Sequence, residues 1–287
     1  MKSPLFAFFG TPEFATYALD ALEREGMLPA LVVTVPDKPR DRGEVTPTPV
    51  KAWAEARGID VITPENFKET PEELLNTDWD VFVVVAYGKM IPKAVLEMPR
   101  KGAVNIHPSL LPKFRGPSPV LSAILADERE TGVSVMLLDE GQDTGPVLAQ
   151  ARIEIDEAEW PLPATLLTEM LFTEGGNLLV ETLPLWLDGT ITPEPQDSAR
   201  ATHTKKFKDE DSLIDPLGDA REQLLKIRAF DNPPAGGHRA HYFDHGRRVI
   251  VTDAQISDGT LEILRVIPEG RKETDFKSFL ASRANTL

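Results

Sequence analysis

The sequence contains no cysteine among its 287 residues. Disulfide bonds, thiolate metal sites and cysteine nucleophiles are therefore excluded, and the composition fits a reducing compartment. No stretch approaches the roughly 20 apolar residues that a membrane-spanning helix needs. The apolar run near the N-terminus is too short for a secretion signal and lacks a small-residue cleavage site. We therefore expect a cytoplasmic protein that does not associate with membranes.

Positive charge is also scarce, because 31 Lys and Arg residues face 46 Asp and Glu, a formal net charge of −15. Taken alone, this balance argues against a nucleic-acid partner. The acidity is uneven: residues 1–189 hold 16 basic and 30 acidic side chains, whereas residues 190–287 hold 15 and 16. Within the acidic part, residues 86–118 carry six basic side chains against Glu97 alone. Such a window indicates an anionic ligand nearby, or equally a solvated surface balanced elsewhere.

The apolar segments predict the fold. Short, continuous runs of Val, Ile and Leu alternate with amphipathic segments of helical period. This alternation is typical of strands buried on both faces of a parallel sheet. We therefore expect an α/β protein with a Rossmann-like, doubly wound, mostly parallel sheet. The expected strands are residues 5–9, 31–35, 61–62, 81–85, 104–106, 133–138 and 147–155, and the main helices are residues 13–24, 50–57 and 161–187.

The composition changes near residue 190. Residues 189–201 carry Pro193, Pro195, Asp197 and Ser198, a composition that is typical of a linker. A helical segment at 219–230 and short strand-like pieces between Gly and Asp turns follow, which indicates a small antiparallel β module. We expect a catalytic domain at 1–189, a linker at 190–206 and a β-rich domain at 207–287.

Two polar motifs follow predicted strands. Asn105 and His107 lie two residues apart at the end of one strand, so their side chains point to the same side. Residues 139–146 hold three carboxylates and two glycines, and Asp143 among them could reach a neighbouring strand end. A carboxylate beside His107 would raise the pKa of the imidazole and fix its tautomer. Taken singly, each motif is explained at least as well by a polar pair that ends a strand or by a solvated turn.

Residues 105–116 together with 143–146 resemble the signature of the folate-dependent formyltransferases. Segments at 10–14, 36–39, 48–51, 83–93, 202–207 and 227–230 resemble the members of that family that act on methionyl-tRNA. The similarity is dense over residues 4–230 and thinner afterwards. It implies that the formyl group of 10-formyltetrahydrofolate is transferred to the α-amino group of methionyl-initiator-tRNA for translation initiation. It also implies a monomer and a reaction that needs no metal.

The resemblance also implies roles for individual residues. Asn105 would donate a hydrogen bond to the oxyanion of the tetrahedral intermediate. His107 would donate a second hydrogen bond or carry the proton that the amine loses, and Asp143 would orient and charge the imidazole or accept the ammonium proton. The residues implied to bind the folate are Ser109, Leu110, Leu111, Pro112, Tyr87 and Gly88. The residues implied to contact the tRNA are Lys38, Arg40, Arg42 and Arg115.

The sequence departs from the family in two places. The loop at 36–49 is a basic arm in the family, but here Asp41 and Glu44 dilute its charge, so we expect weaker tRNA binding and a shallower salt dependence. The family closes its C-terminal module as a small, OB-type β-barrel, and here a segment the size of about two strands is missing. We therefore expect an incomplete barrel with at least one open edge.

Two other functions stay open. An N-formyltransferase for a nucleotide-linked amino sugar or another small amine would share the Asn-x-His and Asp-x-Gly elements. The acidic charge and the shortness of the C-terminal module favour this reading. The segments at 36–51 and the presence of any C-terminal module argue against it. The second alternative is a folate- or RNA-binding protein without turnover, which the complete set of Asn105, His107 and Asp143 disfavours.

Overall fold

The computed structural model describes residues 4–39, 45–231 and 237–284 of the chain. Two compact units divide the chain: the first combines residues 1–116, 132–153 and 169–203, and the second combines 117–131, 154–168 and 204–287. Each unit therefore draws on three separate segments. The linear boundaries expected at 189 and 206 stay a prediction. None of the described helices is both long and apolar enough to cross a membrane.

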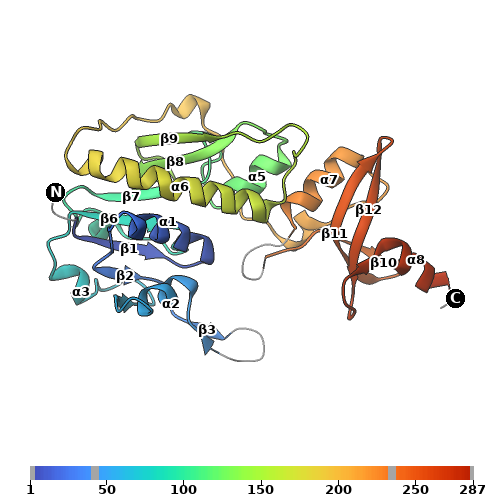
Figure 1. The fold of residues 1–287 in the computed structure, drawn as a ribbon, viewed down its shortest axis with the longest axis horizontal. Helices are drawn as coiled ribbons and strands as arrows, with labels where there is room; N and C mark the ends of the chain where they lie inside the picture. Colours follow the sequence, from blue (N-terminus) through green and yellow to red (C-terminus); the bar gives the residue numbers. More distant parts are fainter. Residues whose placement is uncertain (1–3, 40–44, 232–236, 285–287) are drawn as a thin grey trace. The chain divides into compact units, whose positions relative to one another are not determined.

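The first unit is built on a seven-stranded sheet with the order β5-β2-β1-β6-β7-β8-β9 (Figure 1). Its first five strands are parallel to their neighbours, whereas β7 and β8 are antiparallel. The predicted mostly parallel, Rossmann-like sheet is therefore confirmed. In sheet order the strands are Asp60–Ile62, Leu31–Val33, Phe6–Gly10, Val81–Val85, Ala103–His107, Thr131–Leu137 and Val147–Ile153.

Helices α1 (Glu13–Arg24) and α6 (Ala164–Leu187) pack together through small residues. A Cβ on Gly176 would lie 3.1 Å from Ala18 Cα, and one on Gly175 would lie 2.5 Å from Ile106 Cγ2. These two glycines let the backbone of α6 lie close to both α1 and β7. The helix therefore covers the side of β7 that carries Ile106.

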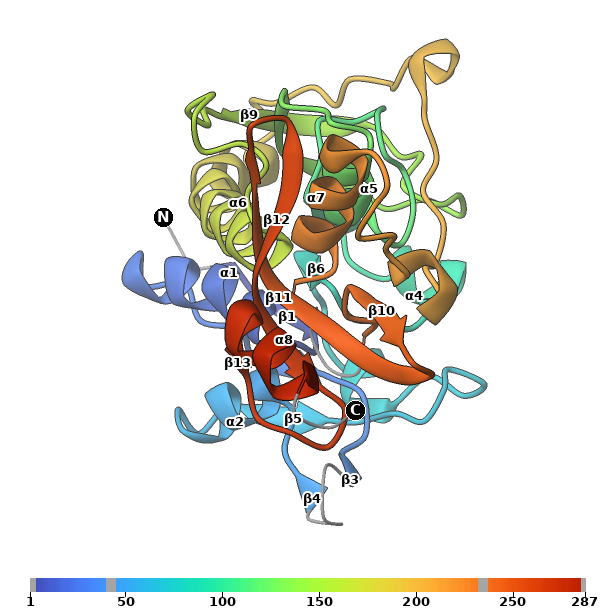
Figure 2. The same ribbon diagram turned by 90° about the vertical axis from the view of Figure 1, so that its right-hand side faces the viewer.

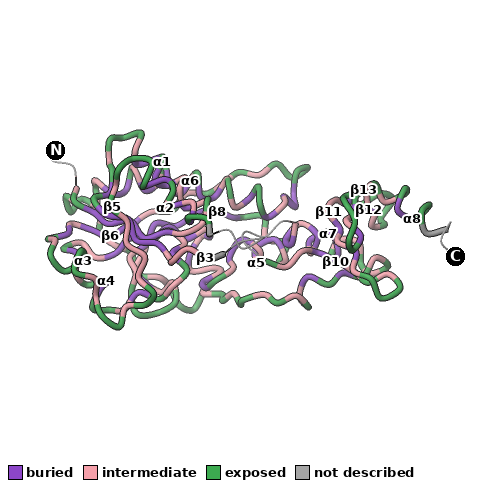
Figure 3. Tube along the Cα trace, turned by 90° about the horizontal axis from the view of Figure 1, so that it is seen from below, coloured by how far each residue is buried: buried purple, intermediate pink, exposed green. Residues whose placement is uncertain are grey.

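A hydrophobic core of the first unit combines side chains of β1, β2, β6 and β7 with those of two short helices. The helices are α3 (Glu72–Leu75) and α4 (Lys93–Leu96), each of only four residues. Both helices were absent from the predicted elements, because four residues are too few to display a helical period. Figure 3 shows the buried residues along β6 and its neighbours. Helix α2 (Pro49–Glu55) begins after Thr48, whose hydroxyl accepts the Lys51 N–H at 3.2 Å.

The second unit holds a four-stranded antiparallel sheet with the order β10-β11-β12-β13 (Figure 2). Among the described residues β10 and β13 are edge strands, as expected for a sheet that does not close. The predicted small β module is thus confirmed. Its strands are His241–Asp244, Arg247–Ser257, Thr260–Pro268 and Thr274–Asp275, and the helices of the unit are α5 (Pro119–Leu125), α7 (Ala220–Ala229) and α8 (Phe276–Ala284).

Candidate active site

Strand β7 places Asn105 and His107 on one face of the large sheet. Ile106, which lies between them, contacts α6 at Gly175. Side chains alternate along a strand, so Asn105 and His107 point to the face opposite α6. Strand β6 runs parallel to β7, with Val84 opposite Asn105. The carboxyl ends of both strands therefore meet at one edge, where open α/β sheets bind their ligands.

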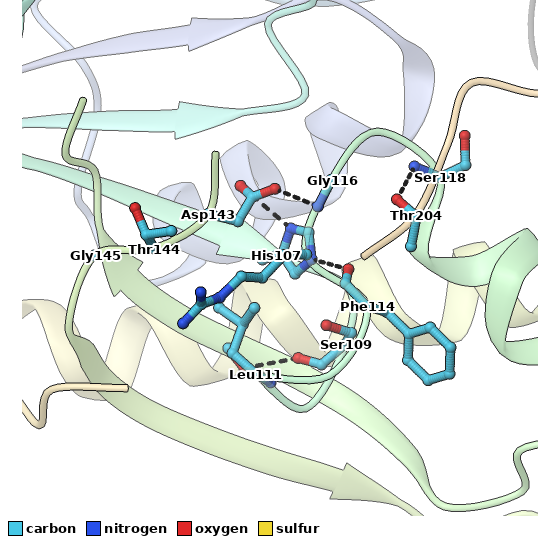
Figure 4. Close-up of polar contacts among 12 residues, drawn as sticks. His107, Ser109, Leu111, Phe114, Gly116, Ser118, Asp143, Thr144, Gly145 and Thr204 are labelled. Atoms are coloured by element: carbon cyan, nitrogen blue, oxygen red, sulfur yellow. Dashed lines mark hydrogen bonds and ion pairs between the residues drawn. The ribbon is translucent and has the colours of Figure 1, made fainter. Parts of the chain in front are cut away.

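Both ring nitrogens of His107 face protein oxygens, although the side chain is buried. Nε2 lies 3.0 Å from the carbonyl oxygen of Phe114, and Nδ1 lies 3.6 Å from Oδ1 of Asp143 (Figure 4). A carbonyl accepts only, so Nε2 carries a proton and donates it to Phe114. In the neutral ring Nδ1 is then unprotonated and faces the carboxylate.

The pKa of His107 lies below its ordinary value because burial disfavours the charged imidazolium. The Asp143 carboxylate and the Phe114 carbonyl act in the opposite direction, and their effect is smaller than that of burial. The sequence-based expectation of a raised pKa was therefore wrong in sign. That expectation took account of the carboxylate, but it could not take account of desolvation, because only the structure shows that His107 is 4 % exposed.

Asp143 is held by its backbone as well as by its side chain. Its φ of +55° lies in the left-handed region, which Asp tolerates better than most residues. Its Oδ2 accepts the backbone N–H of Gly116 at 2.7 Å, so its other oxygen is turned toward His107 (Figure 4). Asp139 closes the same loop by accepting the Gly141 N–H at 3.0 Å and the Thr144 hydroxyl at 2.7 Å.

Left-handed backbone recurs around this site. Ala86 follows β6 with φ +48°, Phe114 lies in the loop after β7 with φ +59°, and Asp143 lies in the loop after β8. Non-glycine residues in this region are strained and persist where the surroundings dictate the conformation. Three such residues in the loops after adjacent strands indicate a functional site. The sequence carried no signal for the first two, because neither Ala nor Phe favours this region.

Two residues that sequence reasoning missed hold the loops of the site, Gln196 the Asp143 loop and Thr202 the Phe114 loop. Gln196 Nε2 donates to the carbonyl oxygens of Asp143 at 2.9 Å and Gly145 at 2.7 Å. Gln196 Oε1 accepts from Arg115 Nε at 2.9 Å. Thr202 accepts the Phe114 N–H through its hydroxyl at 2.8 Å. Gln196 and Thr202 lie in the stretch expected to be a linker, whose composition gave no indication of a role at the site.

The amide of Asn105 makes no hydrogen bond with any other described residue, although the residue is only 9 % exposed. Buried polar groups in proteins normally have a hydrogen-bond partner, so an amide without one is available to a ligand. Asn105 therefore offers an available hydrogen-bond donor. The His107–Asp143 pair offers a group that can gain or lose a proton.

The predicted folate-binding residues of the β7 loop differ in their surroundings. Ser109 is buried and donates its hydroxyl to the carbonyl of Lys113 at 2.7 Å. Leu111 is also buried, and its N–H donates to Ser134 Oγ at 3.1 Å. Leu110 and Pro112 are half-buried. Leu110 and Pro112 therefore keep part of their surface exposed, whereas Ser109 and Leu111 bond within the protein, and the folate contacts of all four stay a prediction.

Tyr87 and Gly88 follow β6 at the same edge. The Tyr87 ring is buried and lies 5.6 Å from the Phe9 ring, and its carbonyl accepts the Thr11 hydroxyl at 2.8 Å. Its own hydroxyl is buried without a hydrogen-bond partner among the described residues, and burial raises the pKa of this phenol to about 12. Gly88 has φ +82°, which favours glycine at this position.

The structure describes only some of the residues that were predicted to contact the tRNA. Lys38 lies in the β3–β4 hairpin (Lys38–Pro39 and Val45–Thr46), whereas Arg40 and Arg42 lie outside the described residues. Asp37 anchors the base of this hairpin, since its Oδ2 lies 2.5 Å from Lys51 Nζ. Arg115 is only 4 % exposed and bonds to Gln196. Its burial favours a structural role, and its contact with RNA stays a prediction.

Among the described residues no group of three or more His, Asp and Glu side chains is arranged to hold a metal ion. The polar groups gathered at the sheet edge are instead an amide, an imidazole, one carboxylate and backbone groups. These groups can donate hydrogen bonds to a developing oxyanion and transfer protons during a reaction at an acyl carbon.

Comparison with known proteins extends this picture. The family model described as "Formyl transferase" matches residues 3–183. The chain is 44% identical over 254 residues to "Methionyl-tRNA formyltransferase" of Chloroflexus aggregans, covering 87% of this chain and 80% of that protein. It is 38% identical over 300 residues to the protein of the same name from Halorhodospira halophila, covering 96% and 95%.

Solved structures share the fold. Methionyl-tRNA formyltransferase from Clostridium thermocellum superposes with a TM-score of 0.62 at 19% identity, covering 93% of this chain and 98% of the other. The N-formyltransferase from Helicobacter canadensis, solved with folinic acid and dTDP-3-aminofucose, gives 0.66 at 18% identity, covering 88% of each chain. At these identities the similarity is one of fold.

Proposed function

Because the chain belongs to the methionyl-tRNA formyltransferases, a group within the formyl transferase family, we propose that it transfers the formyl group of 10-formyltetrahydrofolate to the α-amino group of methionyl-initiator-tRNA. The reaction prepares the initiator for protein synthesis in the cytoplasm. The observation that supports this proposal most strongly is the unpartnered amide of Asn105 beside the His107–Asp143 pair at the sheet edge.

The proposed reaction joins the amine nitrogen to the formyl carbon and breaks the bond from that carbon to N10 of the folate. Attack places negative charge on the formyl oxygen and leaves an excess proton on the attacking nitrogen. Collapse of the tetrahedral intermediate expels N10, which takes up a proton. Atoms and charge therefore balance without another reactant, and the site has to stabilise an oxyanion and move one proton.

Asn105 is assigned to the oxyanion. Its amide N–H donates without carrying charge, and its strand backbone and burial fix its position. A well-placed donor of this type contributes roughly 3–4 kcal/mol to transition-state stabilisation. Because the amide has no partner among the described residues, it does not have to break a bond within the protein to bind the substrate.

His107 is assigned to the proton, and the hydrogen bond from Nε2 to Phe114 identifies Nδ1 as the atom that receives it. The lowered pKa of His107 keeps the imidazole unprotonated near neutral pH, so Nδ1 is free to accept. Asp143 then stabilises the imidazolium through its facing oxygen. An aminoacyl α-amino group titrates about 2–3 units below a lysine, so neutral amine is available near pH 7.

The donor is assigned to the edge formed by the ends of β6 and β7. Leu110 and Pro112 offer half-buried apolar surface there, and Gly88 leaves the backbone accessible. The relation in fold to an N-formyltransferase solved with folinic acid supports a folate in this role. We assign Lys38, Arg40 and Arg42 to phosphates of the tRNA, because Lys and Arg in an otherwise acidic chain favour such contacts.

The decisive experiment supplies 10-formyltetrahydrofolate together with either charged initiator tRNA or a nucleotide-linked amino sugar. We expect formylation of the methionyl-tRNA and no formylation of the sugar above the uncatalysed rate. Formylation of the sugar alone would overturn the acceptor while preserving the chemistry. Tight folate binding without turnover on either acceptor would overturn the chemistry itself.

A further inference from the structure

Residues 114–116 connect the two titratable groups of the site. The Phe114 carbonyl accepts from His107 Nε2 at 3.0 Å, and two residues later the Gly116 N–H donates to Asp143 Oδ2 at 2.7 Å. The residue between them, Arg115, sends its guanidinium to Gln196 at 2.9 Å. One tripeptide therefore sets the position of the imidazole and of the carboxylate together (Figure 4).

Gln196 connects Arg115 to the Asp143 loop through a single side chain. Its Nε2 donates to the carbonyls of Asp143 and Gly145, which flank Thr144. Its Oε1 accepts from Arg115. A primary amide has two N–H donors and one carbonyl acceptor, so a single side chain satisfies all three contacts. Because Asp143 has a strained φ of +55°, the loop needs such contacts to keep its conformation.

We propose that Gln196 is a positioning residue, which bridges Arg115 to the Asp143 loop and so keeps the Asp143 carboxylate facing Nδ1 of His107. This inference rests on the proposed formyl transfer for its kinetic consequence, but its geometric content is independent of it. Among the described residues Gln196 forms its hydrogen bonds with Arg115, Asp143 and Gly145, and none of them reaches the His107 ring or the Asn105 amide. Its effect therefore passes through the Asp143 backbone.

The informative substitution is Gln196→Glu. The carboxylate keeps the size of the side chain and its contact with Arg115, but it cannot donate to the Asp143 and Gly145 carbonyls. We expect kcat to fall about tenfold or more, because displacing a catalytic group by a fraction of an ångström is costly. The KM values for the folate and the tRNA should change by less than about threefold, because Gln196 binds neither substrate.

Two companion variants separate the causes. Gln196→Leu removes all three contacts without adding charge, and it should lower kcat at least as far. Gln142→Glu adds the same charge next to Asp143, at an exposed side chain that bonds to no other described residue. The Gln142→Glu enzyme should keep kcat within about twofold of wild type, because an exposed charge is screened by solvent.

A readout that needs no activity is the titration of the His107 ring, followed by NMR in protein with ¹⁵N-labelled histidine. The chain has only five histidines, so the His107 signal can be assigned with a His107→Asn variant. In Gln196→Leu, which adds no charge, the His107 pKa should fall below its wild-type value, because the carboxylate that opposes the effect of burial moves away. Arg115→Lys, which loses the Nε donor, should shift it in the same direction.

Three outcomes are decisive. A lower kcat with near-constant KM and a lowered His107 pKa supports the proposal. Wild-type kcat in both Gln196 variants and an unchanged titration in Gln196→Leu overturn it, as does a failure of both variants to fold, since Gln196 would then serve the fold alone. If the wild-type chain formylates neither acceptor but Gln196→Leu still shifts the His107 titration, the proposed function fails and the positioning role stands.

Discussion

Nδ1 of His107 lies 3.6 Å from Oδ1 of Asp143, which is longer than a hydrogen bond. The separation follows from the other side of the ring, where Nε2 already donates its proton to the Phe114 carbonyl. The neutral imidazole therefore presents a lone pair to a carboxylate, and the two repel each other. A proton that arrives at Nδ1 turns the repulsion into a charge-assisted hydrogen bond. The pair is thus arranged to receive a proton.

Replacement of Asp143 by Asn tests this arrangement. The amide keeps the size of the side chain but removes the charge that stabilises the imidazolium, so we expect kcat to fall by at least about a hundredfold. Steady-state kinetics on methionyl-tRNA gives the measurement. Glu140→Gln is the matched control, since it removes one charge from an exposed side chain of the same loop and should leave kcat within about twofold. Similar rates for both variants would remove Asp143 from the mechanism.

Asn105→Ala should separate activity from stability. Turnover should drop by about a hundredfold or more when the oxyanion loses its donor. The free energy of unfolding should change by less than about 1 kcal/mol, because the amide has no partner within the described residues to lose. Urea unfolding and single-turnover kinetics give the two values. A large loss of stability with the kcat of wild type would show that the amide serves the fold and not the reaction.

The lowered pKa of His107 predicts a pH dependence of stability. Between that pKa and about 6.5 the unfolded chain binds a proton at this histidine and the folded chain does not. The contribution of His107 is therefore complete above about pH 6.5 and is lost as the pH falls toward its folded pKa. Unfolding free energies of wild type and His107→Asn should diverge from pH 7 to pH 5, with the variant losing less.

The exposed His245 provides the control for this measurement, since its side chain is 75% exposed. It lies in a turn with φ +46°, which Asn tolerates. Parallel profiles for wild type and His107→Asn would contradict the lowered pKa.

Gly145→Ala should damage the Asp143 loop by steric overlap. A Cβ at this position would overlap the backbone carbonyl oxygen of Leu137, which cannot move without disturbing β8. We expect a loss of about 1–3 kcal/mol in unfolding free energy, together with a fall in kcat. Gly26→Ala is the contrasting variant: it adds a Cβ in open space at φ +71°, at the end of α1. It should lower stability by roughly 1 kcal/mol and leave kcat unchanged.

The proposed tRNA contacts of Lys38, Arg40 and Arg42 predict a change in salt dependence. Replacing all three by Ala should weaken tRNA binding and reduce the slope of log K against log salt by roughly 2–3. Binding of the folate should not change. Filter binding or fluorescence titration at several salt concentrations measures the slope, and an unchanged slope would show that these side chains do not contact phosphates.

Much of the first unit could be predicted from local patterns. Val81–Val85 is a run of apolar residues, mostly β-branched, which is typical of a buried strand whatever surrounds it, and it forms β6 as expected. Asn105 and His107 had to share a face once their strand was recognised, because alternation is a property of the extended backbone. The antiparallel pairing of β8 with β7 was not predictable, since apolar runs do not carry direction.

What the sequence by itself determined is therefore the inventory: the strands, the presence of an amide, an imidazole and a carboxylate, and the family. The tertiary structure decided how these groups act. Burial reversed the expected pKa shift of His107, and backbone groups of Phe114 and Gly116 selected which nitrogen and which oxygen face each other. Desolvation and hydrogen-bond direction depend on residues far away in the chain, such as Gly116, which lies 27 residues from Asp143. No local pattern of residues contains that information.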